Sequence, residues 1–89
     1  MTYQIAFPDF DPSTMPEIPA GFVDNSWAGD TCPCFINEKR DMILFIDYAD
    51  SQKHLREFND ADRYSILIGE KSEFSSNDYE VILAIIHDI

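Results

Sequence analysis

The chain has 89 residues and carries 17 Asp and Glu against 6 Lys and Arg, which gives a formal net charge of -11. Its hydrophobic content of 45% is typical of a folded protein, and its length suits a single domain, residues 1–89, with a modest core. Because so negative a field repels phosphates and anionic lipids, we expect neither direct nucleic-acid binding nor membrane binding.

The N-terminal quarter predicts one short strand and a long loop. Residues 1–4 show no basic stretch leading into an apolar one, and no run approaches the ~18 apolar residues of a membrane span, so we expect a cytoplasmic protein. Tyr3, Ile5 and Phe7 alternate with polar or small residues, which predicts a strand. Four prolines between Pro8 and Gly21 then predict an extended loop.

The middle of the chain contains the clearest element, a hairpin. Before it, Val23 and its neighbours predict a short strand or irregular turn, and Trp27, the single tryptophan, is expected to anchor the core. The hairpin itself is predicted from strands at Phe35–Asn37 and Met42–Tyr48, joined by a charged turn at Glu38–Asp41. Since the second strand is apolar on both faces, we predict that it lies in the centre of a sheet.

After the hairpin, the segment from Asp50 to Asp60 predicts two turns of helix or a long hairpin excursion. Asp50 or Ser51 is a candidate N-cap, and Leu55 and Phe58 are three residues apart.

The C-terminal third predicts further strands. Residues 63–70 predict a second apolar strand closed by Gly69, and residues 71–78 predict a polar turn. Residues 79–89 suit either a strand or a helix, and their Val, Ile and Tyr content favours a strand buried on both faces. The expected fold is α+β, with a mostly antiparallel sheet of four or five strands and one or two short helices.

Both cysteines lie in the short stretch "DTCPCF", as Cys32 and Cys34. A structural zinc site needs four ligands and usually a longer spacing between paired cysteines, and the other soft ligands are His54 and His87. A disulfide between the two would close a strained ring. We therefore favour two small buried side chains around a proline turn, with a zinc-binding module as an alternative.

Catalytic patterns are weak in this sequence. Asp47 and Asp50 form a candidate carboxylate pair, but general acid and base chemistry also needs a pocket that orients a substrate, for which a small chain has little room. The three glycines form no phosphate-binding loop. We expect a protein that is not an enzyme and that uses no cofactor.

The acidic residues are the strongest candidates for function. Three pairs lie two apart in sequence, a spacing that in a strand places charges ~6.5–7 Å apart on one side, as along a nucleic-acid backbone. A chain with this many acidic residues also contains such pairs by chance. Its size and composition are therefore stronger grounds for a binding role than the pairs themselves. The predicted partner-binding residues are Asp60, Asp62, Glu73, Asp78 and Glu80, with a second patch at Asp9 and Asp11.

In size, acidity and strand-rich pattern the chain resembles small acidic proteins of phages and mobile elements, among them anti-CRISPR proteins and other DNA mimics. The resemblance implies an inhibitor that occupies the basic nucleic-acid-binding surface of a partner protein. An alternative is a small interaction subunit or adaptor that binds through exposed apolar side chains such as Phe10, Phe58 or Phe74. These two classes differ in the salt dependence of their binding.

Overall fold

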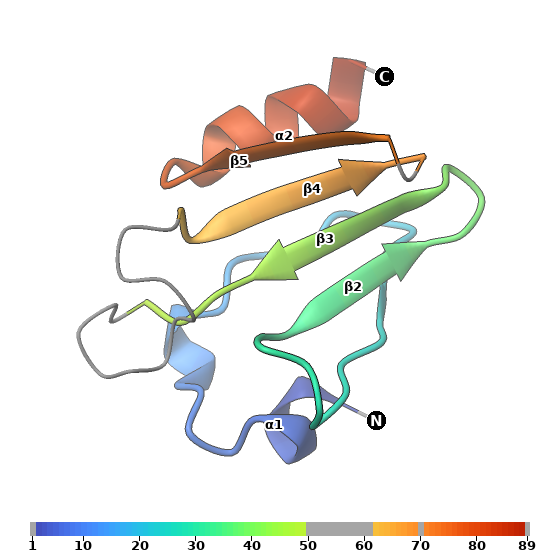
Figure 1. Cartoon of the computed structure of the whole chain (residues 1–89). Coiled ribbons are helices and arrows are strands. Elements are labelled where there is room, and N and C mark those ends of the chain that lie inside the picture. The colour runs from blue at the N-terminus through green and yellow to red at the C-terminus, as the bar shows by residue number, and fades with distance from the viewer. Residues whose placement is uncertain (1, 50–61, 70, 89) are drawn as a thin grey trace.

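A computed structural model describes residues 2–49, 62–69 and 71–88 of the chain (Figure 1). The described residues form a five-stranded sheet, two α-helices and one 3-10 turn. In chain order these elements are α1 (Tyr3–Ala6), η1 (Pro12–Thr14), β1 (Val23–Asp24), β2 (Cys34–Asn37), β3 (Met42–Ile46), β4 (Tyr64–Ile68), β5 (Ser72–Ser76) and α2 (Tyr79–Asp88).

The sheet is antiparallel throughout and follows the sequence order β1-β2-β3-β4-β5. This confirms the predicted α+β class, the hairpin formed by β2 and β3, and the central position of β3. Asp41 closes the hairpin turn with a φ of 55°, and the N–H of Gly69 donates to its carbonyl at 2.9 Å. Gly69 itself has a φ of 61°, a conformation that glycine adopts at little cost and that ends β4 where the sequence predicts.

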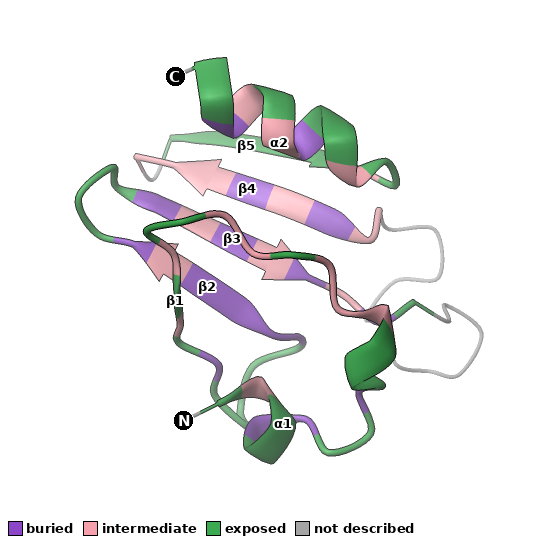
Figure 2. Cartoon of the chain, turned by 180° about the vertical axis from the view of Figure 1, so that it is seen from behind, coloured by how far each residue is buried: buried purple, intermediate pink, exposed green. Residues whose placement is uncertain are grey.

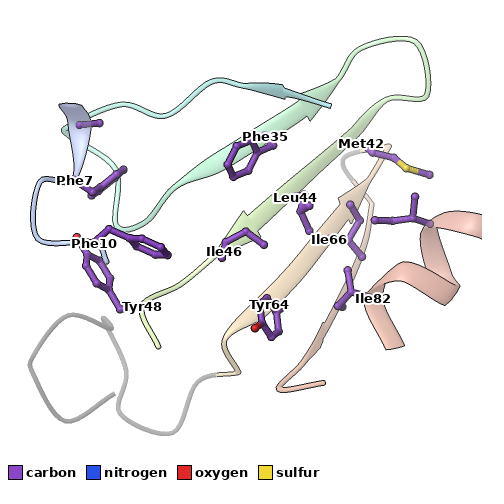
Figure 3. Close-up of a cluster of buried hydrophobic side chains, with 12 residues drawn as sticks. Phe7, Phe10, Phe35, Met42, Leu44, Ile46, Tyr48, Tyr64, Ile66 and Ile82 are labelled. Carbon is purple, nitrogen blue, oxygen red and sulfur yellow. The ribbon is translucent and has the colours of Figure 1, made fainter. Parts of the chain in front are cut away.

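One face of the sheet carries the core. Met42, Leu44 and Ile46 alternate along β3 toward this face, and each is almost completely buried. Figure 2 shows α2 and the N-terminal segment lying across this core face. Figure 3 shows Phe7 and Phe10 of the N-terminal segment beside Ile46 of β3. The buried cluster consists of Ala6, Phe7, Phe10, Phe35, Met42, Leu44, Ile46, Tyr48, Tyr64, Ile66, Ile82 and Ile86.

The strand predicted for residues 79–89 is wrong, because the segment forms helix α2. Ile82 and Ile86, four residues apart, place one side of the helix in the core. The N–H of Glu80 donates to the carboxylate of Asp78 at 3.0 Å, as in an N-cap, and Arg40 donates from its guanidinium to the carbonyl of Ile86 at 2.7 Å. The β propensity of this segment is outweighed by the apolar area that the helix buries against the core face.

Three other predictions are also wrong. The segment predicted as a strand from Tyr3 to Phe7 forms helix α1 over Tyr3–Ala6, and the helix buries Ala6. Residues 71–78, expected to be a polar turn, contain strand β5, whose backbone pairs with β4. Trp27 is 65% exposed and is not a core anchor. The first two predictions failed because tertiary packing, for α1, and backbone pairing, for β5, are not encoded in a local pattern.

The predicted loop from Pro8 to Gly21 is confirmed apart from the short turn η1. It is fastened to the sheet by Arg63, whose guanidinium donates to the carbonyl of Thr14 at 2.7 Å and to the carbonyl of Asp47 at 3.1 Å. The residues proposed for the Asp50 to Asp60 helix lie outside the described part of the chain. Neither described helix is long and apolar enough to cross a membrane.

Candidate protein-binding surface

The second face of the sheet carries a row of apolar side chains that the core does not use. Val23 pairs with Ile36, Ile36 with Ile43, and Ile43 with Leu67, so these four residues lie side by side across four strands. Phe45 lies on the same face, two residues along β3 from Ile43. We call this surface, defined by Val23, Ile36, Ile43, Phe45 and Leu67, the open face.

The open face is only partly shielded from solvent. Val23 is 68% exposed, and Ile36, Ile43, Phe45 and Leu67 are half-buried. None of the five belongs to the buried cluster or packs against it. Figures 1 and 2, which view the molecule from opposite sides, place α2 and residues 15–22 on the other face of the sheet. Sheet neighbours alone can account for such partial burial of side chains.

Acidic side chains border the open face. The apolar row ends on Glu73 of β5, which lies directly opposite Leu67 and is exposed. The hairpin turn between β2 and β3 holds the exposed Glu38 and Asp41 together with the exposed Lys39 and Arg40, so this end of the open face is balanced in charge. The acidic margin is the one at β5, and an apolar strip that ends on carboxylates suits a partner surface that combines apolar and basic groups.

Two of the predicted binding residues, Asp62 and Glu73, lie at this margin. The Asp62 carboxylate accepts hydrogen bonds from the hydroxyl of Ser75 at 3.1 Å and from the side-chain amide of Asn77 at 3.0 Å. Ser75 and Glu73 are two residues apart on β5 and therefore point to the same side of the sheet. The structure thus places both acids beside the open face. Asp60, the expected companion of Asp62, lies outside the described residues.

Asp78 and Glu80 lie at the start of α2 and do not have the extended spacing that the sequence suggested. Asp78 accepts the hydrogen bond from the Glu80 N–H described above. Glu80 also lines a shallow groove of about 390 Å³ whose residues include Glu17 and Tyr79. Burial, followed by the nearby hydroxyl of Tyr64, raises the pKa of Tyr79 to about 12. Asp78 and Glu80 therefore interact with the N-terminus of α2, where negative side chains are favourable.

Asp9 and Asp11 do not lie on a strand either. Asp11 precedes the 3-10 turn η1, and its carboxylate accepts from the hydroxyl of Ser13 at 2.8 Å and from its N–H at 3.0 Å. These hydrogen bonds lower the pKa of Asp11. Burial raises the pKa of Tyr48, and the Asp9 carboxylate raises it further, which places Asp9 near Tyr48. The spacing argument is therefore wrong for Asp9 and Asp11, as for Asp78 and Glu80.

Cys32 and Cys34 are both buried and not joined to each other, as the packing prediction expects. Burial, with a contribution from Asp47, raises the pKa of Cys32 to about 12, and burial with Asp30 raises that of Cys34 to about 11. Thiols with such pKa values stay protonated at neutral pH when no metal is bound, and a protonated thiol is a poor nucleophile. The described side chains include no cluster of three or more His, Cys, Asp and Glu that would hold a metal ion.

Cys34 also closes one corner of the open face. It pairs with Phe45 across the sheet, and its N–H donates to the hydroxyl of Ser26 at 3.2 Å. Its thiol donates to the carbonyl of Asn25 at 3.3 Å, so the loop that follows β1 folds over this end of β2. The rest of the apolar row has no such cover among the described residues.

The open face was missed at the sequence level, although its signal is present. Ile43 and Phe45 alternate with the core residues of β3, and we interpreted a strand that is apolar on both faces as a central strand, which leaves open whether its second face is covered. Pairing register was needed to align Ile43 with Ile36 and Leu67 in one row. A groove of about 670 Å³, lined in part by Val23 and Ile36, extends the row toward the hairpin turn.

Comparison with family models finds no match, and comparison with curated proteins and with solved structures finds no significant similarity.

Proposed function

We propose that the chain is a protein-binding inhibitor, and not an enzyme, that occupies the basic nucleic-acid-binding surface of a cytoplasmic partner through its open face. The observation that supports this most directly is the row of Val23, Ile36, Ile43 and Leu67 ending on the carboxylate of Glu73. Apolar area supplies binding free energy, and bordering carboxylates select a basic partner and speed its association.

The net charge of -11 supports the same choice of partner. Surfaces that bind nucleic acid are rich in Lys and Arg, and an anionic protein that covers them excludes the phosphate backbone. This is the mode of action implied by the resemblance to anti-CRISPR proteins and other DNA mimics. In this proposal Asp62 and Glu73 are the central contacts, and Asp78, Glu80, Asp9 and Asp11 contribute mainly to the long-range field.

The second candidate is an adaptor that binds through apolar contacts alone, which the half-buried row on the open face also favours. Of the aromatic anchors proposed for it, Phe10 is buried in the core, Phe74 is 44% exposed, and Phe58 lies outside the described residues. Salt separates the two candidates, because an apolar interface keeps its affinity at high ionic strength while a charge-bordered one weakens. For the third candidate, a zinc module, the described residues bring no third potential ligand to Cys32 and Cys34, and His54 lies outside them.

The test is capture of partners from a bacterial lysate at low and high salt, followed by competition with DNA or RNA for the purified partner. Two single variants distinguish the apolar contribution to binding from the acidic one. Val23→Lys changes an exposed residue of the row, and Glu73→Lys changes its acidic end. We expect each to weaken binding about tenfold or more, since both act inside the interface.

Glu17→Lys provides the matched control, because Glu17 is exposed, lies among residues 15–22 on the other face of the sheet, and changes the net charge by the same amount as Glu73→Lys. It should change the affinity about twofold or less. A partner that binds nucleic acid and this chain simultaneously would contradict the proposal. Equal effects of Glu73→Lys and Glu17→Lys would reduce the acidic surface to a solubility device.

A further inference from the structure

The two edges of the sheet are protected to different degrees. Strand β1 has only two residues, and the N–H of Tyr3 donates to the carboxylate of Asp24 at 2.8 Å, so helix α1 lies against this edge. Strand β5 has five residues and ends the sheet on the opposite side. Among the described strands it pairs with β4 alone. Its outer backbone groups therefore form an edge that can accept another strand.

Natural sheets usually guard such an edge with a proline, a lysine or a bulge. Residues 72–76, "SEFSS", contain neither proline nor lysine, and their pairing with β4 runs without interruption from Ser72 to Ser76. Four of the five residues are exposed. Glu73 is the single charged residue of the strand and favours basic side chains on an additional strand, while the exposed Lys71 lies two residues before it.

The two sides of β5 differ in chemistry. Phe74 lies opposite Ile66 on the core side and remains 44% exposed. On the same side α2 packs against β4 and β5, and its Val81 is 44% exposed as well. Leu83 lines the groove formed with residues 17–20. Val81 precedes Leu83 by two residues and therefore lies on the opposite flank of the helix, away from that groove. The core side of this edge is therefore apolar.

On the open-face side the edge is acidic and polar. Glu73 lies opposite Leu67 and Ser75 opposite Ser65. Asp62 lies on this side too, held by its hydrogen bond from Ser75 at 3.1 Å. A strand that pairs with β5 places alternate side chains on the two sides, so every second residue meets carboxylates and the residues between them meet Phe74.

We propose that β5 binds an extended segment of the basic partner in which basic and apolar residues alternate, so that this segment becomes a sixth strand of the sheet. Backbone hydrogen bonds supply affinity, and the alternation of side chains supplies specificity. The inference rests on the proposed function, because it names the part of the partner that reaches this edge. A second copy of the chain is disfavoured as the occupant, since two molecules of charge -11 repel each other.

The test uses a fluorescent heptapeptide of alternating lysine and valine, with an otherwise equal peptide in which glutamate replaces lysine. Binding is followed by fluorescence anisotropy at about 0.05 M salt, where charges at the edge are weakly screened. We expect the lysine peptide to bind and the glutamate peptide not to bind. Glu73→Lys should weaken binding about tenfold, whereas Glu17→Lys, the control used above, should change it about twofold or less.

Backbone methylation distinguishes an added strand from simple charge attraction. In a strand, the N–H groups of alternate residues point to opposite sides, so only one set faces β5. Two peptides are compared, one methylated at the lysine nitrogens and one at the valine nitrogens. We expect one of them to lose binding and the other to keep it. In hydrogen exchange of the full chain, the amides of residues 72–76 that face away from β4 should be slowed by the unmodified peptide, and those of residues 34–37 should not.

Equal behaviour of the two methylated peptides, or unchanged exchange in β5, would overturn the proposal. So would a dimer in sedimentation that Glu73→Lys disrupts, because a second copy would then occupy the edge. The proposed function is judged separately with the captured partner. If Val23→Lys weakens that complex and Glu73→Lys does not, the open face binds the partner and β5 does not. If neither variant matters, both proposals are wrong.

Discussion

The two faces of the sheet are made by the same strands and are used differently. On β3, Leu44 is completely buried against the core, while its neighbours Ile43 and Phe45 point to the open face and stay half-buried. The core face is covered by α2 and the N-terminal segment, and the open face by described residues only at the Cys34 corner. Apolar residues on a strand therefore reveal which positions can be buried, without revealing which face is covered.

The largest expected effect compares neighbouring residues of β3. Leu44→Ala should lower the free energy of unfolding by about 2–5 kcal/mol, because it leaves a cavity in the core. Ile43→Ala, its matched control on the open face, should cost less than about 1.5 kcal/mol, since solvent already reaches the side chain. Urea denaturation measures both. Similar costs at the two positions would show that the open face is as well packed as the core.

The next effect concerns the covered corner of the open face. Replacing Cys32 and Cys34 together by serine should lower the free energy of unfolding by about 1–3 kcal/mol, because two hydroxyls enter a buried site. Replacement of both by alanine keeps the site apolar and should cost less. Partner binding should survive either change. Loss of structure in the wild type that zinc alone restores would instead establish a metal site.

Alkaline pH provides a third comparison, because burial opposes ionisation of the two thiols, Cys32 and Cys34. The pKa is raised from 9.0 to about 12 for Cys32 and from 9.0 to about 11 for Cys34, chiefly by burial. Their stabilising contribution is fully present below pH 9.0 and is lost as the pH rises through the folded pKa values. We expect the free energy of unfolding to fall above pH 9.0 and more gradually in the double alanine variant. Parallel curves for the two proteins would contradict this assignment.

The smallest expected effect is that of salt on the whole acidic surface. Raising the ionic strength from about 0.1 to 1 M shortens the Debye length from about 10 to 3 Å and weakens repulsion among the acids. The melting temperature should therefore rise by a few degrees, and by less in a Glu73→Lys variant with lower net charge. Sodium chloride is the appropriate salt, because strongly excluded salts such as sulfate stabilise most proteins. A constant or falling melting temperature would mean that repulsion contributes little.

Local patterns in the sequence determined the central hairpin, the strand at Tyr64–Ile68 and the proline-rich loop. Alternation, a charged turn and repeated prolines each act over a few residues and need no distant partner. The composition alone determined the acidity of the chain. The burial of Cys32 and Cys34 follows from their residue type, because cysteine is among the residues most often buried.

Only the tertiary structure decided the rest. Residues 79–88 have the composition of a strand, yet the core required a cover whose apolar residues recur every three or four positions, and Ile82 and Ile86 provide it in a helix. Residues 72–76 have the composition of a turn, yet they form a strand because the backbone of β4 offered hydrogen bonds to them. The candidate site depends on the same contacts, because register brings Glu73 to the end of an apolar row, and sequence spacing does not encode register between strands.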